Sequence, residues 1–387
     1  MKKIIVFSSH TTTESGGVGT HLKHLINEVN QSDFESKIIL GASKLNLIKI
    51  NLIRILLSFF VSKDTNEIIF LNLYILALKN TLTKSIKSIK TNDLDELVIH
   101  CHDKQTAIAS LLIKNNYQFR IKVLQTLHAP FSEQYRITNS KNNELISFSE
   151  ILDSGSSIYI DKLIGVDLLQ VDIAKKIVDF KEDKTVAIAN AVDTKELDTV
   201  QKGNVNEKKY FIIARHLHTK NGVIYAVKAF EKFLKNYNDY DLLIMGDGPE
   251  KGEIESYINK NNLQNNIKLI GRKSHHDSLK YIFNSEASII PSIPIGVYIE
   301  ATSLTMLESM YLRVPVVASN IGGLAEVIEN RKSGLLFEPK NINEIVSLLE
   351  TVVKDKELVI SIKDNARLEI LNNFSSNQWF KKISMNY

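Results

Sequence analysis

Two glutamates in the C-terminal half are spaced to serve a helix and a ligand at its start. Glu300 precedes an apolar-periodic segment and Glu308 falls inside it, with seven residues between them. Ser303 has the residue type of a helix N-cap, and the N–H groups of Leu304 and Thr305 would then point out of the helix start, where an anion is favoured. A phosphate bound there would have Glu300 beside the group that it carries, while Glu308 could bind the vicinal hydroxyls of a ribose.

Two cations lie upstream of this segment on one loop. Arg215 ends an expected strand at 209–215, and Lys220 lies where the next helix begins. Two cations and a helix N-terminus could hold a diphosphate without any metal ion. The alternative is that both are ordinary surface cations at a strand end. Gly271 and Arg272 lie at the end of another expected strand, where they would be next to a base.

A glycine-rich turn follows the first expected strand. Gly16 and Gly17 open a helix, and glycines at such a place let backbone N–H groups approach an anion. A nicotinamide dinucleotide site would need the spacing G-x-G-x-x-G and an acid that ends the second strand. The chain has neither, so the turn predicts contact with a phosphate or a sugar and argues against dinucleotide binding.

Short β-branched runs alternate with helical patterns along the chain, which predicts parallel sheets with helices on both faces. The expected strands are 2–8, 36–42, 96–102, 121–127, 161–166, 184–190, 209–215, 241–247, 266–271, 286–292, 315–319 and 334–339. The pattern predicts an α/β protein with doubly wound domains at 1–192 and 209–370, a linker at 193–208, and a helix at 371–387 that packs back on the first domain. The crevice between the domains is the expected binding site.

The bulk composition narrows the class of protein. A length of 387 residues suits two domains, and 44% hydrophobic with 24% charged residues is typical of a globular protein. The net charge of +4 gives no argument for nucleic acid. A single cysteine, Cys101, fits a reducing compartment, and residues 1–10 read as a first strand instead of a signal peptide. No charge-free apolar run approaches the roughly 20 residues of a spanning helix, so the expected location is the cytoplasm.

Two stretches are locally cationic. Residues 44–63 and 79–90 alternate apolar side chains with lysines and an arginine, and neither contains an acid. This pattern predicts peripheral contact with an anionic surface, such as the inner face of the plasma membrane. The alternative is a helix packed on its own sheet with lysines at its rim.

Histidines are the remaining side chains with ligand chemistry. His100 and His102 lie on one face of an expected strand, but zinc would need a second cluster and none is obvious. We therefore expect structural or crevice-lining histidines and no metal ion. His275 and His276 read as the start of a helix and nothing more.

Seven motifs, in order, resemble those of the retaining family-four glycosyltransferases of the GT-B fold (glycosyl transferases group 1). The motifs are TLHAPF, ARHLHTKNG, MGDGP, LIGR, EATSLTMLESM, RVPVVASNIGGLAEVI and SGLLFEP. The resemblance covers nearly the whole chain and is most specific over 209–339. It implies two Rossmann-like domains that face a central cleft, the first binding an acceptor and the second a nucleotide-sugar donor.

The resemblance also implies roles for the residues that match these motifs. Arg215 and Lys220 would hold the donor diphosphate, Glu300 would contact the hydroxyls of the transferred sugar, and Glu308 would contact the ribose. His128, in TLHAPF, matches the histidine that lies beside the sugar at the reaction centre.

The first domain supplies one further implied contact, and the second shows one departure from the family. The Gly16–Gly17 loop would close over the phosphates. After the first glutamate the family has Gly-Phe-Gly, whereas this chain has Ala301, Thr302 and Ser303. Side chains replace glycines beside the sugar, so the donor preference is expected to differ from that of the family.

The sequence thus predicts a retaining hexosyltransferase. It would move a hexose or an N-acetylhexosamine from a UDP-linked donor to a sugar, glycolipid or protein-linked acceptor in polysaccharide or glycoconjugate synthesis, without cofactor or metal. Replacing Arg215 or Lys220 by alanine is expected to cripple turnover and to leave the fold intact. Two alternatives stay open: a sugar-nucleotide epimerase of the same fold and a non-catalytic partner protein.

Overall fold

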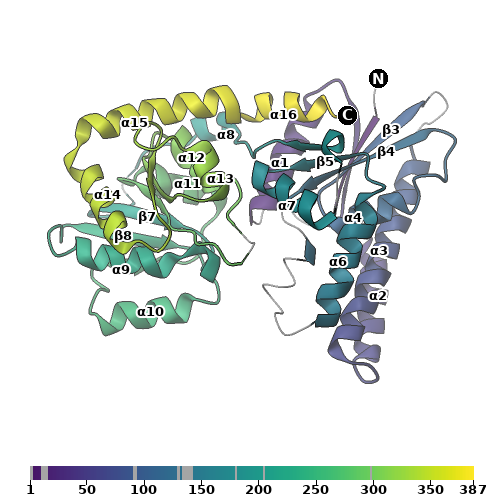
Figure 1. Ribbon diagram of the computed structural model, residues 1–387, viewed down its shortest axis with the longest axis horizontal. Coiled ribbons are helices and arrows are strands. Elements are labelled where there is room, and N and C mark those ends of the chain that lie inside the picture. Colours follow the sequence, from purple (N-terminus) through teal and green to yellow (C-terminus); the bar gives the residue numbers. More distant parts are fainter. Residues whose placement is uncertain are drawn as a thin grey trace. The chain divides into compact units, whose positions relative to one another are not determined.

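The chain folds into two compact units, each built on one parallel sheet. The computed structural model describes residues 3–9, 16–89, 94–128, 131–132, 143–178, 181–203, 205–296 and 299–387. Unit 1 consists of Met1–Ile188 with Phe380–Tyr387, and unit 2 of Ala189–Trp379. Each sheet has six strands, and helices cover it (Figure 1). The predicted pair of doubly wound α/β domains is confirmed.

The sheet of unit 1 has the strand order β2-β1-β3-β4-β5-β6, with every pair parallel. The strands are β1 Lys3–Ser8, β2 Glu35–Leu40, β3 Glu96–Cys101, β4 Arg120–Leu127, β5 Lys162–Gly165 and β6 Thr185–Ala187. Successive residues of β1, from Ile4 to Phe7, are all buried, as expected for a strand covered on both faces. The strand order reverses between β1 and β3, so the loops after these two strands diverge and leave room for a ligand.

The helices of unit 1 include a long antiparallel pair. They are α1 Gly16–Asn30, α2 Lys44–Leu57, α3 Lys63–Lys87, α4 Lys104–Leu111, α6 Asn143–Ser157 and α7 Leu168–Val178. The hydroxyls of Ser43 and Ser62 accept hydrogen bonds from the first turns of α2 and α3, which fixes where each helix begins. The cationic stretch 44–63 is therefore one helix followed by a turn and the start of a second helix.

The sheet of unit 2 has the strand order β12-β11-β10-β7-β8-β9, again all parallel. The strands are β7 Lys209–Ala214, β8 Tyr240–Met245, β9 Ile267–Leu269, β10 Ser288–Ile290, β11 Val316–Ser319 and β12 Leu335–Phe337. The first strand of the unit, β7, pairs with β8 on one side and with β10 on the other. The reversal of strand order thus falls between β7 and β10, and the loops that follow these strands form the expected ligand site.

The helices of unit 2 cover both faces of this sheet. They are α8 Thr194–Asp198, α9 Val223–Phe233, α10 Lys251–Lys260, α11 His275–Phe283, α12 Leu304–Tyr311, α13 Gly322–Val327, α14 Ile342–Lys354 and α15 Lys356–Glu369. Helix α8 lies in the segment 193–208 that the sequence assigns to a linker. Its Leu197 is buried in the core with Tyr311, whose hydroxyl bonds to Asp198.

The last helix, α16 Ser376–Ser384, leads the chain out of unit 2, and its final residues pack in unit 1. The Tyr387 hydroxyl lies 3.0 Å from Nδ1 of His100 on β3, while Nε2 of His100 lies 2.8 Å from the Thr126 hydroxyl. Burial and the neighbouring His21 lower the pKa of His100 to about 3, so this imidazole is a neutral, structural group. No helix in the described ranges is long and apolar enough to span a bilayer.

Candidate active site

Arg215 directly follows β7, the strand at the reversal point of unit 2. Its backbone is approached closely by Gly246, which follows β8: a Cβ at Gly246 would lie 1.9 Å from the Arg215 carbonyl oxygen. Gly222, with φ of +58°, meets the loop after β10 in the same way, because its Cβ would lie 2.0 Å from the Pro291 carbonyl oxygen. These two glycines let the loops after three neighbouring strands pack against one another.

The Arg215 guanidinium is held by side chains from several of these loops. Nη1 donates to the Ser303 hydroxyl at 2.9 Å. Nη2 donates to Asn221 Oδ1 at 2.7 Å and to the Ser292 hydroxyl at 3.2 Å, and it lies 2.7 Å from Glu300 Oε1. The cluster therefore joins the loop after β7, the loop after β10 and the start of α12.

Glu300 is a buried carboxylate that stays ionised because of its neighbours. Burial by itself would raise the pKa of Glu300, but the charges of Arg215 and Lys220 and hydrogen bonds from Arg215 and Ser292 hold it below its ordinary value. The Ser292 hydroxyl donates to Glu300 Oε2 at 3.4 Å. A carboxylate fixed in this way can accept hydrogen bonds from sugar hydroxyls.

The helix expected after Glu300 is present and begins one residue after its predicted cap. Ser303 is the N-cap of α12, and its hydroxyl accepts from the Met306 amide at 3.4 Å. Leu304 and Thr305 form the first turn, where helix geometry leaves the amides without an intrahelical acceptor. The structure thus brings Arg215, Glu300 and a helix N-terminus to one place, which suits an anionic group.

Lys220 lies in a single helical turn, Thr219–Asn221, just before α9. Its carbonyl oxygen accepts a hydrogen bond of 2.8 Å from the Ile293 amide in the loop after β10. Its charge helps to lower the pKa of Glu300, so the ammonium group acts on the same cluster. Both cations that the sequence singled out therefore act on one carboxylate.

Glu308, on α12, has a partner that the sequence did not indicate. Glu308 Oε1 lies 2.8 Å from Nε2 of His275, at the start of α11, and Nδ1 of the same ring lies 3.4 Å from Glu196 Oε1. Hydrogen bonds to Glu196 and then to Glu308 raise the pKa of His275 to about 10, against the opposing effect of its burial. An imidazolium thus bridges two carboxylates, and the reading of His275 as a mere helix start was incomplete.

Gly271 and Arg272 lie in the loop after β9, the loop that the sequence assigns to the base. Gly271 has φ of +67°, and its carbonyl oxygen accepts a hydrogen bond of 3.1 Å from the Gly246 amide. Arg272 is exposed, and its charge contributes to lowering the pKa of His216, after the larger effect of burial. This loop is therefore tied to the loop after β8, beside the Arg215 backbone.

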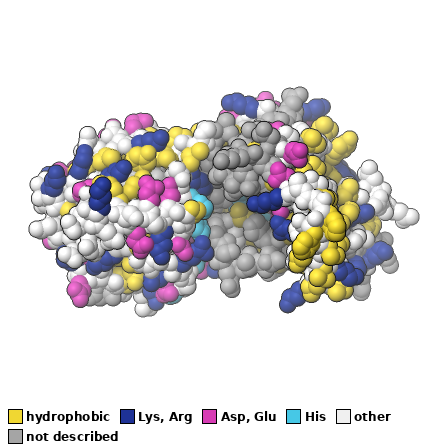
Figure 2. Space-filling view, turned by 90° about the horizontal axis from the view of Figure 1, so that it is seen from below, with side chains coloured by type: hydrophobic (Ala, Val, Ile, Leu, Met, Phe, Trp, Pro, Cys, Tyr) yellow, Lys and Arg dark blue, Asp and Glu magenta, His cyan; other side chains and the backbone are white. Residues whose placement is uncertain are grey.

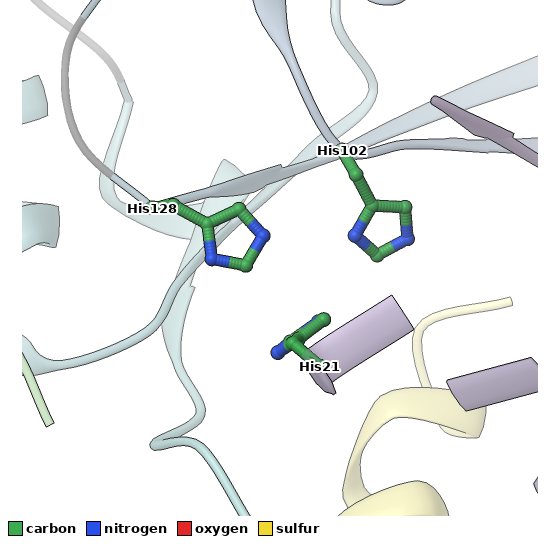
Figure 3. Close-up of side chains that lie close together, drawn as sticks. All are labelled: His21, His102 and His128. Atoms are coloured by element: carbon green, nitrogen blue, oxygen red, sulfur yellow. The ribbon is translucent and has the colours of Figure 1, made fainter. Parts of the chain in front are cut away.

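In unit 1 a histidine cluster occupies the reversal point of the sheet. His102 follows β3, His128 follows β4 and His21 lies on α1, and their rings face one another (Figure 3). The His21 ring centroid lies 4.6 Å from that of His128 and 5.3 Å from that of His102, both in edge-to-face contact. His128, which the sequence assigns to the reaction centre, thus has two histidine neighbours.

This cluster offers three nitrogen ligands, one from each ring, within 4.8 Å of one another. Two nitrogens on one tetrahedral zinc ion are only about 3.3 Å apart. Three nitrogen atoms that lie within 4.8 Å of one another are therefore not by themselves evidence of a metal centre. Three packed imidazoles can equally donate to and accept from hydroxyl groups.

The remaining predicted contact is the glycine turn of unit 1. Gly16 and Gly17 open α1, but the preceding residues 10–15 lie outside the described part of the chain, as do 129 and 130 after His128. Ser9, the last described residue after β1, donates its amide hydrogen to Asp103 Oδ2 at 2.6 Å.

Five residues of the Arg215 cluster, the Glu308–His275 contact and the histidine cluster were not assigned to a site from the sequence. They are His21, Glu196, Asn221, His275 and Ser292. All of them except His21, which lies in the second turn of α1, are within two residues of an element boundary, and this position is the only local signal that they carry. Their partners are far away in the sequence: Ser292 contacts Arg215 across 77 positions and His275 contacts Glu308 across 33.

The family model of glycosyl transferases group 1 matches residues 194–369. An uncharacterized glycosyltransferase of Methanocaldococcus jannaschii is 25% identical over 290 residues, which are 72% of this chain and 71% of that protein. Among solved structures, a sucrose-phosphate synthase from Thermosynechococcus elongatus has a TM-score of 0.76 at 15% identity and covers 100% of this chain and 98% of its own. HepE of Anabaena, solved in complex with UDP, has a TM-score of 0.73 at 14% identity, with 100% and 99% covered.

These likenesses agree with the geometry of the two units. The matched residues contain the whole Arg215–Glu300–Ser303 cluster and the Glu308–His275 pair. The structural neighbours extend over both units and establish the fold of the whole chain. The model of glycosyl transferases group 1 thus matches the part of the chain that carries these clusters, and the whole chain has the two-domain α/β fold known as GT-B.

Proposed function

We propose that this chain is a retaining hexosyltransferase that takes a hexose or an N-acetylhexosamine from a UDP-linked donor. The observation that carries the proposal is the cluster at the reversal point of unit 2, where Arg215, Glu300 and the N-terminus of α12 meet. A uridine donor is supported by HepE of Anabaena, which shares the fold and binds UDP.

In the proposed mechanism the donor diphosphate binds at the start of α12. Breaking the bond between the sugar and the diphosphate leaves additional negative charge on the phosphate oxygens. Arg215, Lys220 and the amides of the first turn of α12 stabilise that charge as it develops. Loss of one such donor group typically costs about 3–4 kcal/mol in the barrier. Glu300 holds hydroxyls of the departing sugar.

The acceptor hydroxyl is proposed to reach the sugar from unit 1. His128 is the residue that we place beside the sugar, with His21 and His102 packed against its ring. Gly16 and Gly17 are proposed to contact the phosphates. We assign Glu308 to the ribose, Gly271 and Arg272 to the base, and no step to a metal ion.

The proposed setting is the synthesis of cell-surface polysaccharide or glycoconjugate in the cytoplasm. An acceptor of this kind is met at a membrane when it is lipid-linked. Peripheral contact with the inner face of the plasma membrane, through 44–63 and 79–90, is therefore part of the same proposal.

The proposal is tested by incubating the purified chain with a panel of UDP-, GDP- and ADP-linked sugars, with and without sugar acceptors. Acceptor-dependent transfer from a UDP-sugar, with an NMR spectrum of early product that shows the donor's anomeric configuration, is the expected result. An inverted product would refute the retaining mechanism. Epimerisation of the donor without any acceptor would assign the chain to the sugar-nucleotide epimerases instead.

A further inference from the structure

Helix α2 has two apolar faces, and only one of them packs on the rest of unit 1. Ile50 is buried and Leu47 packs beside it against the core. The opposite face is exposed and carries large apolar side chains at spacings of three and four residues, which place them on one stripe of a helix. The stripe and the turn that continues it consist of Leu45, Ile48, Leu52, Ile55, Leu56, Phe59 and Phe60.

The exposure of this face is large and concentrated. Eight of the eighteen large apolar side chains that are exposed in the described part of the chain lie between residues 45 and 60. Phe59 and Phe60, in the turn after α2, are 78% and 83% exposed. Figure 2 shows the apolar surface of this region with cationic side chains beside it. A contiguous apolar patch of this kind on a folded surface marks a binding site.

Cations border the stripe. At 100° per residue, Lys44 and Lys49 fall on its two sides, and both are exposed. Arg54 lies on the opposite side, where it pairs with Glu67 and covers the Phe70 ring, so it belongs to the packing of α2 on α3. Residues 44–63 contain no acidic residue.

The second cationic stretch has a different character. In 79–90 the apolar side chains Leu82 and Ile86 are buried in the core of unit 1. What remains outside is the lysines at the rim of α3, of which Lys84 and Lys87 are exposed. An apolar face directed outward is therefore a property of α2 and not of 79–90.

We propose that the outward face of α2, with Phe59 and Phe60, docks on an anionic lipid surface. A helix of 14 residues is about 21 Å long and would lie in the plane of the lipid headgroups. Its apolar stripe enters the boundary of the acyl chains, and Lys44 and Lys49 contact the headgroup phosphates. A second copy of this chain is the less suitable occupant, because two such faces would bring lysines against lysines.

This inference rests on the proposed function in one respect: the proposed function explains why the chain would be at a membrane. The binding itself is measured without turnover. Vesicles of phosphatidylcholine with phosphatidylglycerol, and vesicles of phosphatidylcholine alone, are sedimented with the full chain. We expect binding to the anionic vesicles that weakens as salt is added and is far weaker to the neutral ones.

The double variant F59S/F60S tests the face, because both side chains lie outside the core. It should need about tenfold more anionic lipid for half-maximal binding. The matched control is I360S/L368S on α15, whose two side chains are 58% and 55% exposed and lie far from α2 in the sequence. This control should bind as the unchanged chain does. Donor turnover with a soluble acceptor and no lipid should be the same in all three proteins.

Three outcomes would overturn the inference. The first is equal sedimentation of the unchanged chain with neutral and anionic vesicles. The second is undiminished binding by F59S/F60S. The third is a dimer that F59S/F60S abolishes, in a chain that does not bind vesicles, which would assign the face to a second copy. If the chain binds anionic vesicles but shows no transfer from any donor, the proposed function is wrong, while the inference that α2 docks on anionic lipid is retained.

Discussion

The Arg215 guanidinium and the Glu300 carboxylate lie 2.7 Å apart, and their side chains are only 9% and 10% exposed. A buried pair of this kind has consequences for stability as well as for catalysis. Removing one partner leaves the other charge buried without compensation, at a typical cost of about 3–5 kcal/mol. From the sequence alone, Arg215→Ala was expected to leave the fold intact. Because the pair is buried, we now expect the same change to destabilise the fold.

Replacing Arg215 by alanine should lower both turnover and the free energy of unfolding. Glu300 would keep the hydrogen bond from Ser292 and the influence of the Lys220 charge, but it would lose the partner that lies 2.7 Å away. Urea unfolding should show a loss of about 3–5 kcal/mol relative to the unchanged chain. The double variant R215A/E300Q should lose less than the sum of its two single variants, because the buried charge is removed together with its partner.

Lys220→Ala is the matched comparison for Arg215→Ala. It removes the other cation of the cluster, whose side chain is not fully buried. Turnover should fall by a similar factor while unfolding changes by less than 1 kcal/mol or so. Near-normal rates in both purified alanine variants would show that neither cation stabilises a departing diphosphate.

Ser303 is expected to position Arg215 in addition to capping α12. Its hydroxyl accepts from Arg215 Nη1 and from the Met306 amide. Ser303→Ala should cost about 1 kcal/mol of stability from the lost cap and should also lower kcat. Ser274, the N-cap of α11, provides the control, because its hydroxyl accepts from the Asp277 amide. Ser274→Ala should show a similar loss of stability at unchanged kcat. Equal effects of the two changes on kcat would show that Ser303 does not position Arg215.

His275 makes the stability of unit 2 depend on pH. Its pKa is raised from 6.5 to about 10, so its interactions with Glu196 and Glu308 stabilise the fold fully below pH 6.5 and are lost as pH rises toward 10. Urea midpoints measured between these two values should fall for the unchanged chain and fall less for H275Q. His276 is exposed, and H276Q should retain the full dependence. H275Q should also raise the KM for the donor about tenfold, if Glu308 holds the ribose as proposed.

The strands of both sheets were predictable because parallel strands that are buried on both faces consist of continuous runs of β-branched and other apolar residues. Each of the twelve expected strands overlaps one of β1–β12. Helix α6 is rich in serine, a residue type that by itself favours caps and turns. In the structure the Ser154 and Ser157 hydroxyls bond back to the carbonyls of Glu150 and Asp153 one turn earlier, which satisfies them inside the helix.

The site was predictable where its chemistry is local and not where it depends on tertiary contacts. Arg215 and Ser303 could be placed from strand ends and cap residues alone. The pairing of His275 with Glu308 could not, because it joins the starts of two helices through side chains and leaves no periodic pattern. The outward stripe of α2 was visible as an apolar pattern, but only the packing of Ile50 decides which face is covered.

Gly323 should be indispensable for the placement of Glu300. Its amide donates to the Glu300 carbonyl at 3.0 Å, and a Cβ at this position would lie 2.3 Å from the Thr302 amide nitrogen. Gly323→Ala must therefore displace the backbone beside Glu300, at a cost of about 1–3 kcal/mol and with a large loss of kcat. Gly252→Ala on α10 is the control, since a Cβ there meets nothing within 4 Å, and it should be neutral or slightly stabilising. Full activity of Gly323→Ala would show that the start of α13 does not control the position of Glu300.

The histidine cluster gives the sharpest test of a metal-free reaction. If His128 acts beside the sugar without a metal ion, removing metal ions with a chelator should leave kcat unchanged, while His128→Ala should lower it. His21→Ala removes one ring of the cluster without removing His128, so it should have the smaller effect on kcat. If a bound zinc ion were required, chelation would abolish transfer, zinc would restore it, and His21→Ala would be as damaging as His128→Ala because either change breaks the ligand set. In the metal-free case His128→Ala is the more damaging change, whereas in the zinc case the two changes are equally damaging. Metal analysis of the purified chain beside the three rate measurements distinguishes the two cases.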